Sequence, residues 1–74
     1  MSNGARLAEG LGNHLRELRE AKGLTQAQLA DLIGVSRKTV NTVENGVFVP
    51  STVVALKLAK ALGCAVEDLF FIAD

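Results

Sequence analysis

Tyrosine and tryptophan are absent from this 74-residue chain, and cysteine, histidine and proline each occur once. A single cysteine, Cys64, excludes an internal disulfide and any zinc site built on several cysteines. His14 has no second histidine or carboxylate cluster beside it, so we expect a surface residue, with no metal site and no cofactor. Cys64 is expected to be buried or half-buried rather than redox-active, because no basic neighbour is evident to lower the pKa of its thiol.

Long apolar runs are also missing. Lys57, Lys60 and Glu67 interrupt the most apolar part of the chain, and no run approaches the roughly 20 residues that cross a bilayer. The N-terminus lacks an apolar block behind a basic start, which is the pattern of a signal peptide. We therefore expect a protein of the reducing cytoplasm with no membrane partner.

The chain also lacks an excess of positive or negative charge. Eight lysine and arginine residues offset eight aspartate and glutamate residues, so the formal net charge is zero. Nucleic-acid binders often carry a basic excess, so a nucleic-acid partner would be held by a few placed groups rather than by bulk attraction to phosphate. The chain shows no nucleophile–base pair, phosphate-cradling glycine loop or carboxylate dyad. We expect no enzyme activity and no small-molecule ligand.

The chain does contain the residues that typically begin and end short helices. Hydrophobic residues make up 49% of a length that suits one small domain. Thr25 is a good N-cap with Gln28 completing a capping box, Ser36 caps the next helix, and glycines follow several helices. These signals predict an all-α fold, with a frayed or partly helical arm at 1–10 and a domain at 11–74. The expected helices lie at about 11–23, 25–34, 36–44, 52–62 and 66–70.

The apolar spacing predicts which residues form the core. On the first helix Leu11, Leu15 and Leu18 share one face, and Arg16 is spaced for a solvated ion pair with Glu20. The other expected core residues are Leu29, Ala30, Ile33, Val35, Val40, Val43, Ala55, Leu58, Ala59, Leu62, Val66, Leu69 and Phe70. Phe70-Phe71-Ile72 is the one segment that resembles a strand.

Residues 26–45, QAQLADLIGVSRKTVNTVEN, fit two helices that cross at a steep angle through a short turn. Ala30 is small where the second helix must pass close, and Gly34 supplies the permissive backbone of the turn. Apolar residues of the first helix then face Val40 and Val43 on the second. The pattern predicts a helix-turn-helix.

If both valines point inward, helical geometry places a polar set outward: Arg37, Lys38, Asn41 and Thr42. A helix with such donors in its N-terminal half fits the major groove of DNA. Arg37 or Lys38 can bond the O6 and N7 atoms of guanine. Asn41 suits the edge of adenine, and Thr42 a thymine methyl or a hydrogen bond. The alternative is that the Arg37-Lys38 pair is only a solvated helix start.

A phosphate contact is expected next to this surface. The N-terminus of a helix attracts phosphate through its free N–H groups, and Gln26 begins the preceding helix. Both are placed to contact the DNA backbone.

The segment LRELREAKGLTQAQLADLIGVSRKTVNTVENG, continued by PSTVVALKLAKALG, resembles the lambda-repressor/Cro-type (Xre) regulators. The resemblance covers about residues 11–70 and implies a five-helix lambda-repressor-like bundle whose third helix, about 36–44, reads DNA. It assigns Gln26 to phosphate and Asn45 to supporting the backbone of the next loop. Its base-contacting residues are Ser36, Arg37, Lys38 and Thr42.

The resemblance also implies two structural features. An arginine on the first helix pairs with a glutamate closing the third, here Arg19 and Glu44. The ending GCAVEDLFFIAD resembles the shortest members of the family, which dimerise partly through a C-terminal extended segment. Two residues depart from the family pattern: Val47 replaces a Lys or Arg, which weakens the expectation of a phosphate contact in that loop, and Thr52 replaces a leucine.

The region around Pro50 holds more apolar residues than one small core needs: Val47, Phe48, Val49, Val53 and Val54. They either pack under the loop or form a dimer contact that includes Phe48 and Val53, since exposed apolar patches mark interfaces. Phe71 and Ile72 are likewise expected to contact a second copy, against simple C-terminal packing.

These patterns together predict a sequence-specific transcriptional regulator, a repressor that binds a palindromic operator in double-stranded DNA as a homodimer. Its two recognition helices would lie about 34 Å apart, one turn of DNA. The alternative from another class is an antitoxin-like module that uses this fold mainly to bind a partner protein. The zero net charge and the apolar residues 47–54 favour that alternative. A phage or restriction-system controller would differ from the first hypothesis in biology rather than in chemistry.

Overall fold

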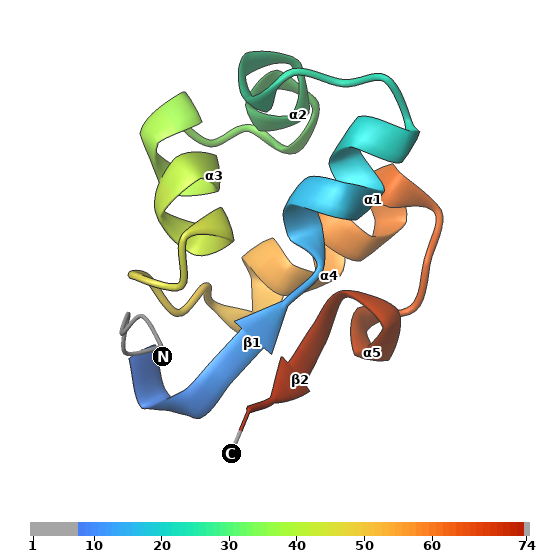
Figure 1. Ribbon diagram of the computed structural model, residues 1–74. Coiled ribbons are helices and arrows are strands. Elements are labelled where there is room, and N and C mark those ends of the chain that lie inside the picture. Colours follow the sequence, from blue (N-terminus) through green and yellow to red (C-terminus); the bar gives the residue numbers. More distant parts are fainter. Residues whose placement is uncertain (1–7, 74) are drawn as a thin grey trace.

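Five α-helices and a two-stranded sheet make up the part of the chain described by the computed structural model, residues 8–73 (Figure 1). In chain order the elements are a 3-10 turn (Ala8–Gly10), β1 (Leu11–Asn13), α1 (Leu15–Ala21), α2 (Gln26–Ile33), α3 (Arg37–Glu44), α4 (Thr52–Leu62), α5 (Val66–Leu69) and β2 (Phe70–Ile72). The predicted five-helix bundle is confirmed. Residues 1–7 of the expected arm lie outside the described residues.

The caps predicted around α2 and α3 are present. Thr25 Oγ1 accepts from the backbone N–H of Gln28 at 3.0 Å, and the Gln28 side chain accepts from the backbone N–H of Thr25 at 2.9 Å. Ser36 Oγ accepts from the backbone N–H of Thr39 at 3.1 Å. Gly34 ends α2 in the left-handed region with φ 76°, which glycine adopts without strain. Local sequence therefore sets both ends of the turn between these helices.

The prediction of a helix from Leu11 was wrong. Residues 11–13 form β1, which pairs antiparallel with β2 so that Leu11 lies opposite Ile72 and Gly12 opposite Phe71. Helix α1 begins only at Leu15, whose backbone N–H donates to Asn13 Oδ1 at 2.9 Å. The helical spacing of the leucines extended one turn too far, because the pairing partner lies at the other end of the chain.

The strand-like segment 70–72 is confirmed as β2, and its pairing with β1 brings the two ends of the described chain together (Figure 1). Gly12 lies directly against the Phe71 ring, so that a Cβ at this position would clash with the ring unless the ring shifted. The ring of His14 stacks on Phe71 with centroids 4.8 Å apart. His14 is exposed, as expected, but it precedes α1 rather than lying within it.

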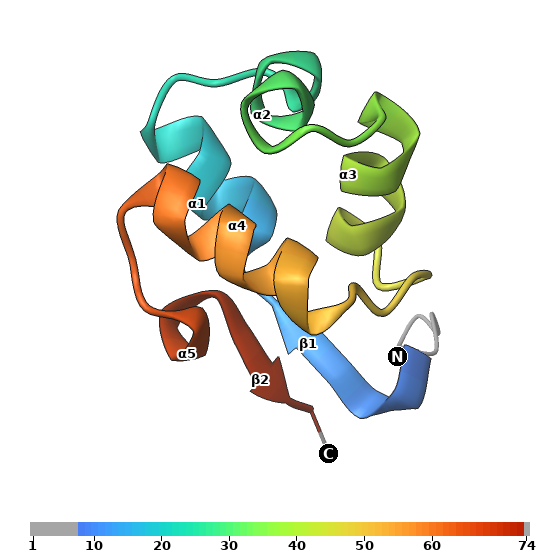
Figure 2. The ribbon, with the colours of Figure 1, turned by 180° about the vertical axis from the view of Figure 1, so that it is seen from behind.

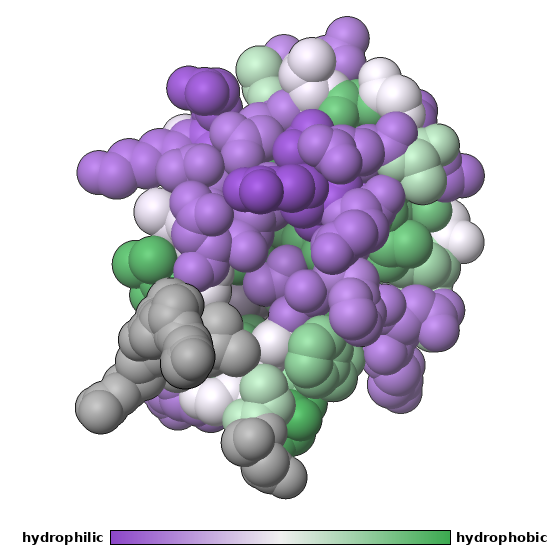
Figure 3. All heavy atoms as spheres, in the orientation of Figure 1, coloured by the Kyte–Doolittle hydropathy of each residue, from purple (hydrophilic) through white to green (hydrophobic). Residues whose placement is uncertain are grey.

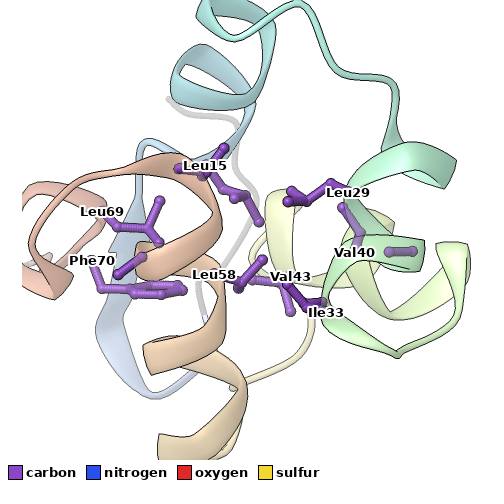
Figure 4. Packing of buried hydrophobic residues seen from close by; sticks show 11 residues of the cluster. Leu15, Leu29, Ile33, Val40, Val43, Leu58, Leu69 and Phe70 are labelled. Carbon is purple, nitrogen blue, oxygen red and sulfur yellow. The ribbon is translucent and has the colours of Figure 1, made fainter.

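The core gathers apolar side chains from every helix and from β2 (Figure 4). Its buried members are Leu15, Leu29, Ala30, Ile33, Val40, Val43, Leu58, Ala59, Leu62, Leu69 and Phe70. All were predicted. Leu11, Leu18, Val35, Ala55 and Val66 are only partly buried at its margin. In the rear view α4 crosses the centre of the molecule between α2 and the two strands (Figure 2).

Polar and apolar side chains occupy different parts of the surface. Polar side chains gather over α1, α2 and α3, and apolar ones show towards the sheet (Figure 3). The exposed large apolar residues are Leu32, Val47, Phe48, Val49, Val53, Leu56, Phe71 and Ile72. Among residues 8–73, no helix is long and apolar enough to cross a membrane.

Candidate nucleic-acid interface

Helices α2 and α3 pack against each other through a turn of three residues, 34–36. Ala30 is 2% exposed, and its carbonyl accepts hydrogen bonds from the backbone N–H groups of both Gly34 and Val35. The small side chain at this position leaves room for the close crossing that a helix-turn-helix requires.

The orientation of α3 follows from its two buried valines. Val40 is 1% exposed and Val43 is 2% exposed. Ser36, Arg37 and Lys38 are exposed at the N-terminal end of the helix. By helical spacing, Lys38 lies on the side away from the two valines and Arg37 on its flank. Helix α3 therefore presents two cations and a hydroxyl to solvent at its N-terminal end, the half of a recognition helix that meets base edges.

The hydroxyl of Thr42 is already engaged within its own helix. It donates to the backbone carbonyl of either Lys38 or Thr39, each at 3.0 Å. This side chain is half-buried. Thr42 therefore offers its methyl group and the lone pairs of its oxygen to a ligand rather than a free donor.

A chain of amide side chains runs along α3. Gln26 Nε2 donates to Asn41 Oδ1 at 3.2 Å and to Glu44 Oε1 at 3.0 Å. Asn45 Nδ2 donates to the same Asn41 oxygen at 3.3 Å. The amide nitrogen of Gln26 is thus shared between two protein oxygens. In the described part of the chain, the Asn45 side chain bonds to Asn41 and Arg16, whereas Val47 and Phe48 of the loop donate their N–H groups to the Thr42 carbonyl.

Arg19 and Glu44 form a buried ion pair between α1 and α3. Arg19 Nε lies 2.6 Å from Glu44 Oε2, and the two side chains are 10% and 0% exposed. Burial by itself raises the pKa of Glu44, but hydrogen bonds from Arg19 and Gln26 and the positive charge of Arg19 outweigh it, so that the pKa lies below its usual value. The hydrogen bond to Glu44 likewise raises the pKa of Arg19. Both groups are held in their charged forms.

Arg16 also reaches this cluster, which sequence reasoning missed. Its Nε lies 3.5 Å from Glu44 Oε1, and its Nη2 donates to Asn45 Oδ1 at 3.4 Å. The predicted partner was Glu20, and that prediction was wrong because the packing of α1 against α3 offers a buried carboxylate instead. The one signal available was position: Arg16 lies three residues before Arg19, on the same face of α1.

A shallow hollow lies beside the N-terminus of α2. It is lined by Arg19, Glu20, Gly23, Leu24, Thr25, Gln26, Ala27 and Arg37. An anion in this hollow would meet the first free N–H groups of α2 together with the guanidinium of Arg37. The hollow adjoins the outward face of α3, so one phosphate and the bases next to it could be contacted together.

Of the apolar residues around Pro50, Val54 alone packs against the core as a half-buried residue. Val47 is 70% exposed and Val53 is 60% exposed. Packing under the loop therefore does not account for this region. Phe71 stacks on His14, yet it remains 41% exposed.

Cys64 is half-buried, as expected. Burial and the charge of Asp68 raise the pKa of its thiol, with Lys22 opposing them. Among residues 8–73 no group of three or more metal-ligating side chains comes together.

Sequence and structure comparisons place this chain among helix-turn-helix proteins. The family model for helix-turn-helix proteins matches residues 15–69. An uncharacterised HTH-type transcriptional regulator of Bacillus subtilis, YgzD, is 40% identical over 62 residues, which are 84% of this chain and 94% of that protein. The competence pilus inhibition repressor of Acinetobacter baylyi is 38% identical over 64 residues, 86% of this chain and 58% of the repressor. The crystal structure of the restriction-modification controller protein C.AhdI from Aeromonas hydrophila matches with a TM-score of 0.69 and 50% identity, covering 73% of this chain and 82% of that one.

Proposed function

The chain belongs to the lambda-repressor-like (Xre) family of helix-turn-helix transcriptional regulators, and from that premise we propose that it represses transcription as a homodimer bound to a palindromic operator. Like its family and relatives, it is a DNA-binding regulator and not an enzyme. The proposal concerns how it binds, which residues contact DNA, and the sign of regulation.

One observation carries the proposal: α3 turns Val40 and Val43 inward and Arg37 and Lys38 outward. An α-helix with its side chains is about 10–12 Å across, which fits the major groove, about 12 Å wide. Arg37 and Lys38 would bond guanine O6 and N7 atoms from the N-terminal half of α3. The neutral net charge is compatible with this, because the contact depends on two placed, exposed cations and not on a basic excess of the whole chain.

The remaining contacts divide between bases and backbone. Ser36 and the methyl group of Thr42 would touch base edges next to the two cations, and Asn41 would reach an adenine edge once Gln26 turns towards phosphate. Gln26 and the N-terminus of α2 would bind phosphate in the adjoining hollow. Asn45 would support a contact with the DNA backbone at the C-terminal end of α3.

The homodimer is proposed from the exposed apolar residues. Phe48 is 48% exposed and Ile72 is 75% exposed. An apolar groove lies near both regions, lined by Leu11, Val49, Pro50, Thr52, Ala55, Leu56, Val66 and Phe70. A second copy that covered this groove with Phe48, Val53, Phe71 and Ile72 would remove these side chains from water at about 25 cal/mol per Å². Such association suits a core this small.

Selection of bound sequences from a random duplex library tests the proposal. We expect one palindromic site whose half-sites are centred about 10–10.5 base pairs apart, or a multiple of that spacing. A variant carrying Arg37→Ala and Lys38→Ala should enrich no sequence. Enrichment of the same palindrome by that variant would contradict the role given to α3.

Sedimentation of the free protein tests the dimer. Val53→Glu and Ile72→Glu should each shift the protein towards monomer, because a charge in an apolar contact is costly. Leu32→Glu is the matched control, since Leu32 is an equally exposed apolar residue, at 63%, on α2. A wild-type protein that sediments as a monomer at all concentrations would contradict the dimer.

The same exposed apolar residues favour a second candidate, an antitoxin-like module that binds a partner protein. A partner would then cover Phe48 and Val53 instead of a second copy. Gentle purification from the native host would yield a stable hetero-complex in that case. DNA affinity that falls steeply with salt would favour the regulator, because a purely protein-binding module lacks that dependence.

A further inference from the structure

Arg16 is the cation on the α1–α3 surface that neither the predicted base contacts nor the buried ion pair uses. Its side chain is 55% exposed, and its two polar contacts, to Glu44 at 3.5 Å and to Asn45 at 3.4 Å, are long. Exposed ion pairs of this length contribute little to stability. Holding the domain together is therefore a weak account of its position.

The carboxylate that Arg16 faces is already neutralised. Glu44 accepts a 2.6 Å bond from Arg19 and a 3.0 Å bond from Gln26. Two guanidinium groups thus surround one carboxylate, and the cluster carries one surplus positive charge. Because Arg19 is buried and Arg16 is not, the surplus is presented to solvent at Arg16.

The surplus positive charge lies at the C-terminal end of α3, where it would favour the approach of a DNA phosphate. The C-terminal end of a helix is the negative end of its dipole and repels phosphate, and α3 ends with Glu44 and Asn45. Arg37 and Lys38 lie at the opposite end of the helix. Arg16 supplies a cation to the end that would otherwise be unfavourable to the DNA backbone.

The hydrogen-bond chain connects Arg16 to the outward face of α3. Arg16 bonds to Asn45, Asn45 bonds to Asn41, and Asn41 is one of the exposed residues of the recognition helix. A DNA backbone that passes the C-terminal end of α3 therefore meets the guanidinium of Arg16 next to the amide of Asn45. Arg16 can leave Glu44 for a phosphate at little cost, because Glu44 keeps Arg19 and Gln26.

We propose that Arg16 binds a phosphate of the operator backbone at the C-terminal end of α3, with Asn45 beside it. The proposal rests on the function proposed above. It assigns Arg16 to affinity rather than to base recognition, since phosphate contacts carry no sequence information directly.

The test compares two variants that each lose one charge and keep part of the side chain. Arg16→Gln removes the proposed contact, and Lys57→Gln removes an exposed cation of α4 that lies outside this surface. Both are measured on the duplex selected by the wild-type protein and on a random duplex, over a series of salt concentrations. Arg16→Lys retains the charge.

We expect Arg16→Gln to weaken binding several-fold on both duplexes and to reduce the slope of log affinity against log salt by about 0.9 per protomer. Lys57→Gln should leave the slope unchanged, and Arg16→Lys should restore it. Thermal unfolding of Arg16→Gln should match the wild type, which separates a lost contact from a lost fold.

A slope for Arg16→Gln equal to that of Lys57→Gln would overturn the inference, as would a loss confined to the selected duplex. Failure of the wild-type protein to bind either duplex would instead overturn the proposed function, so the two failures are distinguishable.

Discussion

The Nε atom of Arg19 on α1 donates to Oε2 of Glu44, the last residue of α3, across 2.6 Å. The same guanidinium donates through Nη1 to the carbonyl of Leu24 at 2.8 Å. One buried side chain therefore joins the first helix, the loop that enters α2, and the end of α3. The direction in which α3 protrudes depends on this junction.

Removing one partner of this pair should strongly destabilise the protein. Arg19→Ala leaves Glu44 as a buried carboxylate with weaker partners, and breaking such a pair costs about 3–5 kcal/mol. That loss is comparable to the whole stability of a domain this small. Urea unfolding followed by circular dichroism measures it, with Glu17→Ala as the exposed control on the same helix. An Arg19→Ala protein as stable as that control would contradict the role of the pair.

The acid sensitivity of the protein should depend on Glu44. Its pKa is lowered in the folded state by Arg19 and Gln26 despite burial. Its stabilising contribution is therefore present above the ordinary glutamate pKa and is lost as the pH falls through the lowered folded value. Glu44→Gln should flatten this acid limb of stability against pH, whereas Glu17→Gln should leave it intact. The measurement is the unfolding free energy from pH 7 downwards, and identical acid limbs for Glu44→Gln and wild type would refute the assignment.

Base recognition should depend on Arg37 at a single position of each half-site. Arg37→Ala should weaken binding by about 1–3 kcal/mol and relax the preference at one base pair, because a bidentate contact to guanine is lost. Titration of duplexes that differ at single base pairs checks this. Lys60→Ala, at an exposed position on α4, is the charge-matched control. An unchanged base preference would show that Arg37 is a solvated helix start.

The turn between α2 and α3 should tolerate no larger residue at its crossing. Ala30 is 2% exposed, whereas Ala27 on the same helix is exposed. Ala30→Leu should cost about 1–3 kcal/mol or more through overpacking, and Ala27→Leu should stay within about 0.5 kcal/mol of wild type. Thermal unfolding compares the two. Equal stabilities of the Ala30→Leu and Ala27→Leu variants would mean that α2 and α3 can move apart without a loss of folding free energy.

Local signals predicted the part of the fold that they control. Thr25, Ser36 and Gly34 carry their own hydrogen bonds or backbone preferences, so the limits of α2 and α3 could be inferred from a few neighbouring residues. Leu11 could not be placed in this way. Its helical spacing is real, but the pairing with Ile72 depends on the packing of the whole bundle.

In the candidate site, too, local features could be predicted and contacts between helices could not. The inward valines fixed which residues of α3 face outward, because one helix determines that geometry by itself. The partners of Arg16, Gln26 and Asn45 depend on how α1, α2 and α3 meet. Pairs across three helices are not encoded in a local spacing, and so Arg16 was matched to a neighbour on its own helix.

The pairing of β1 with β2 also bears on the order in which the protein folds. Each helix forms from local contacts, but this ladder closes a loop that contains all five helices of the described chain. Closure over such a separation costs chain entropy that only the assembled helices can offset. The β1–β2 pairing should therefore form last in folding and open first. Its backbone amides should exchange hydrogen faster than those around Val40 or Leu58. Any association through Phe71 and Ile72 would then be open only to fully folded protomers, so that unfinished chains are kept out of the assembly.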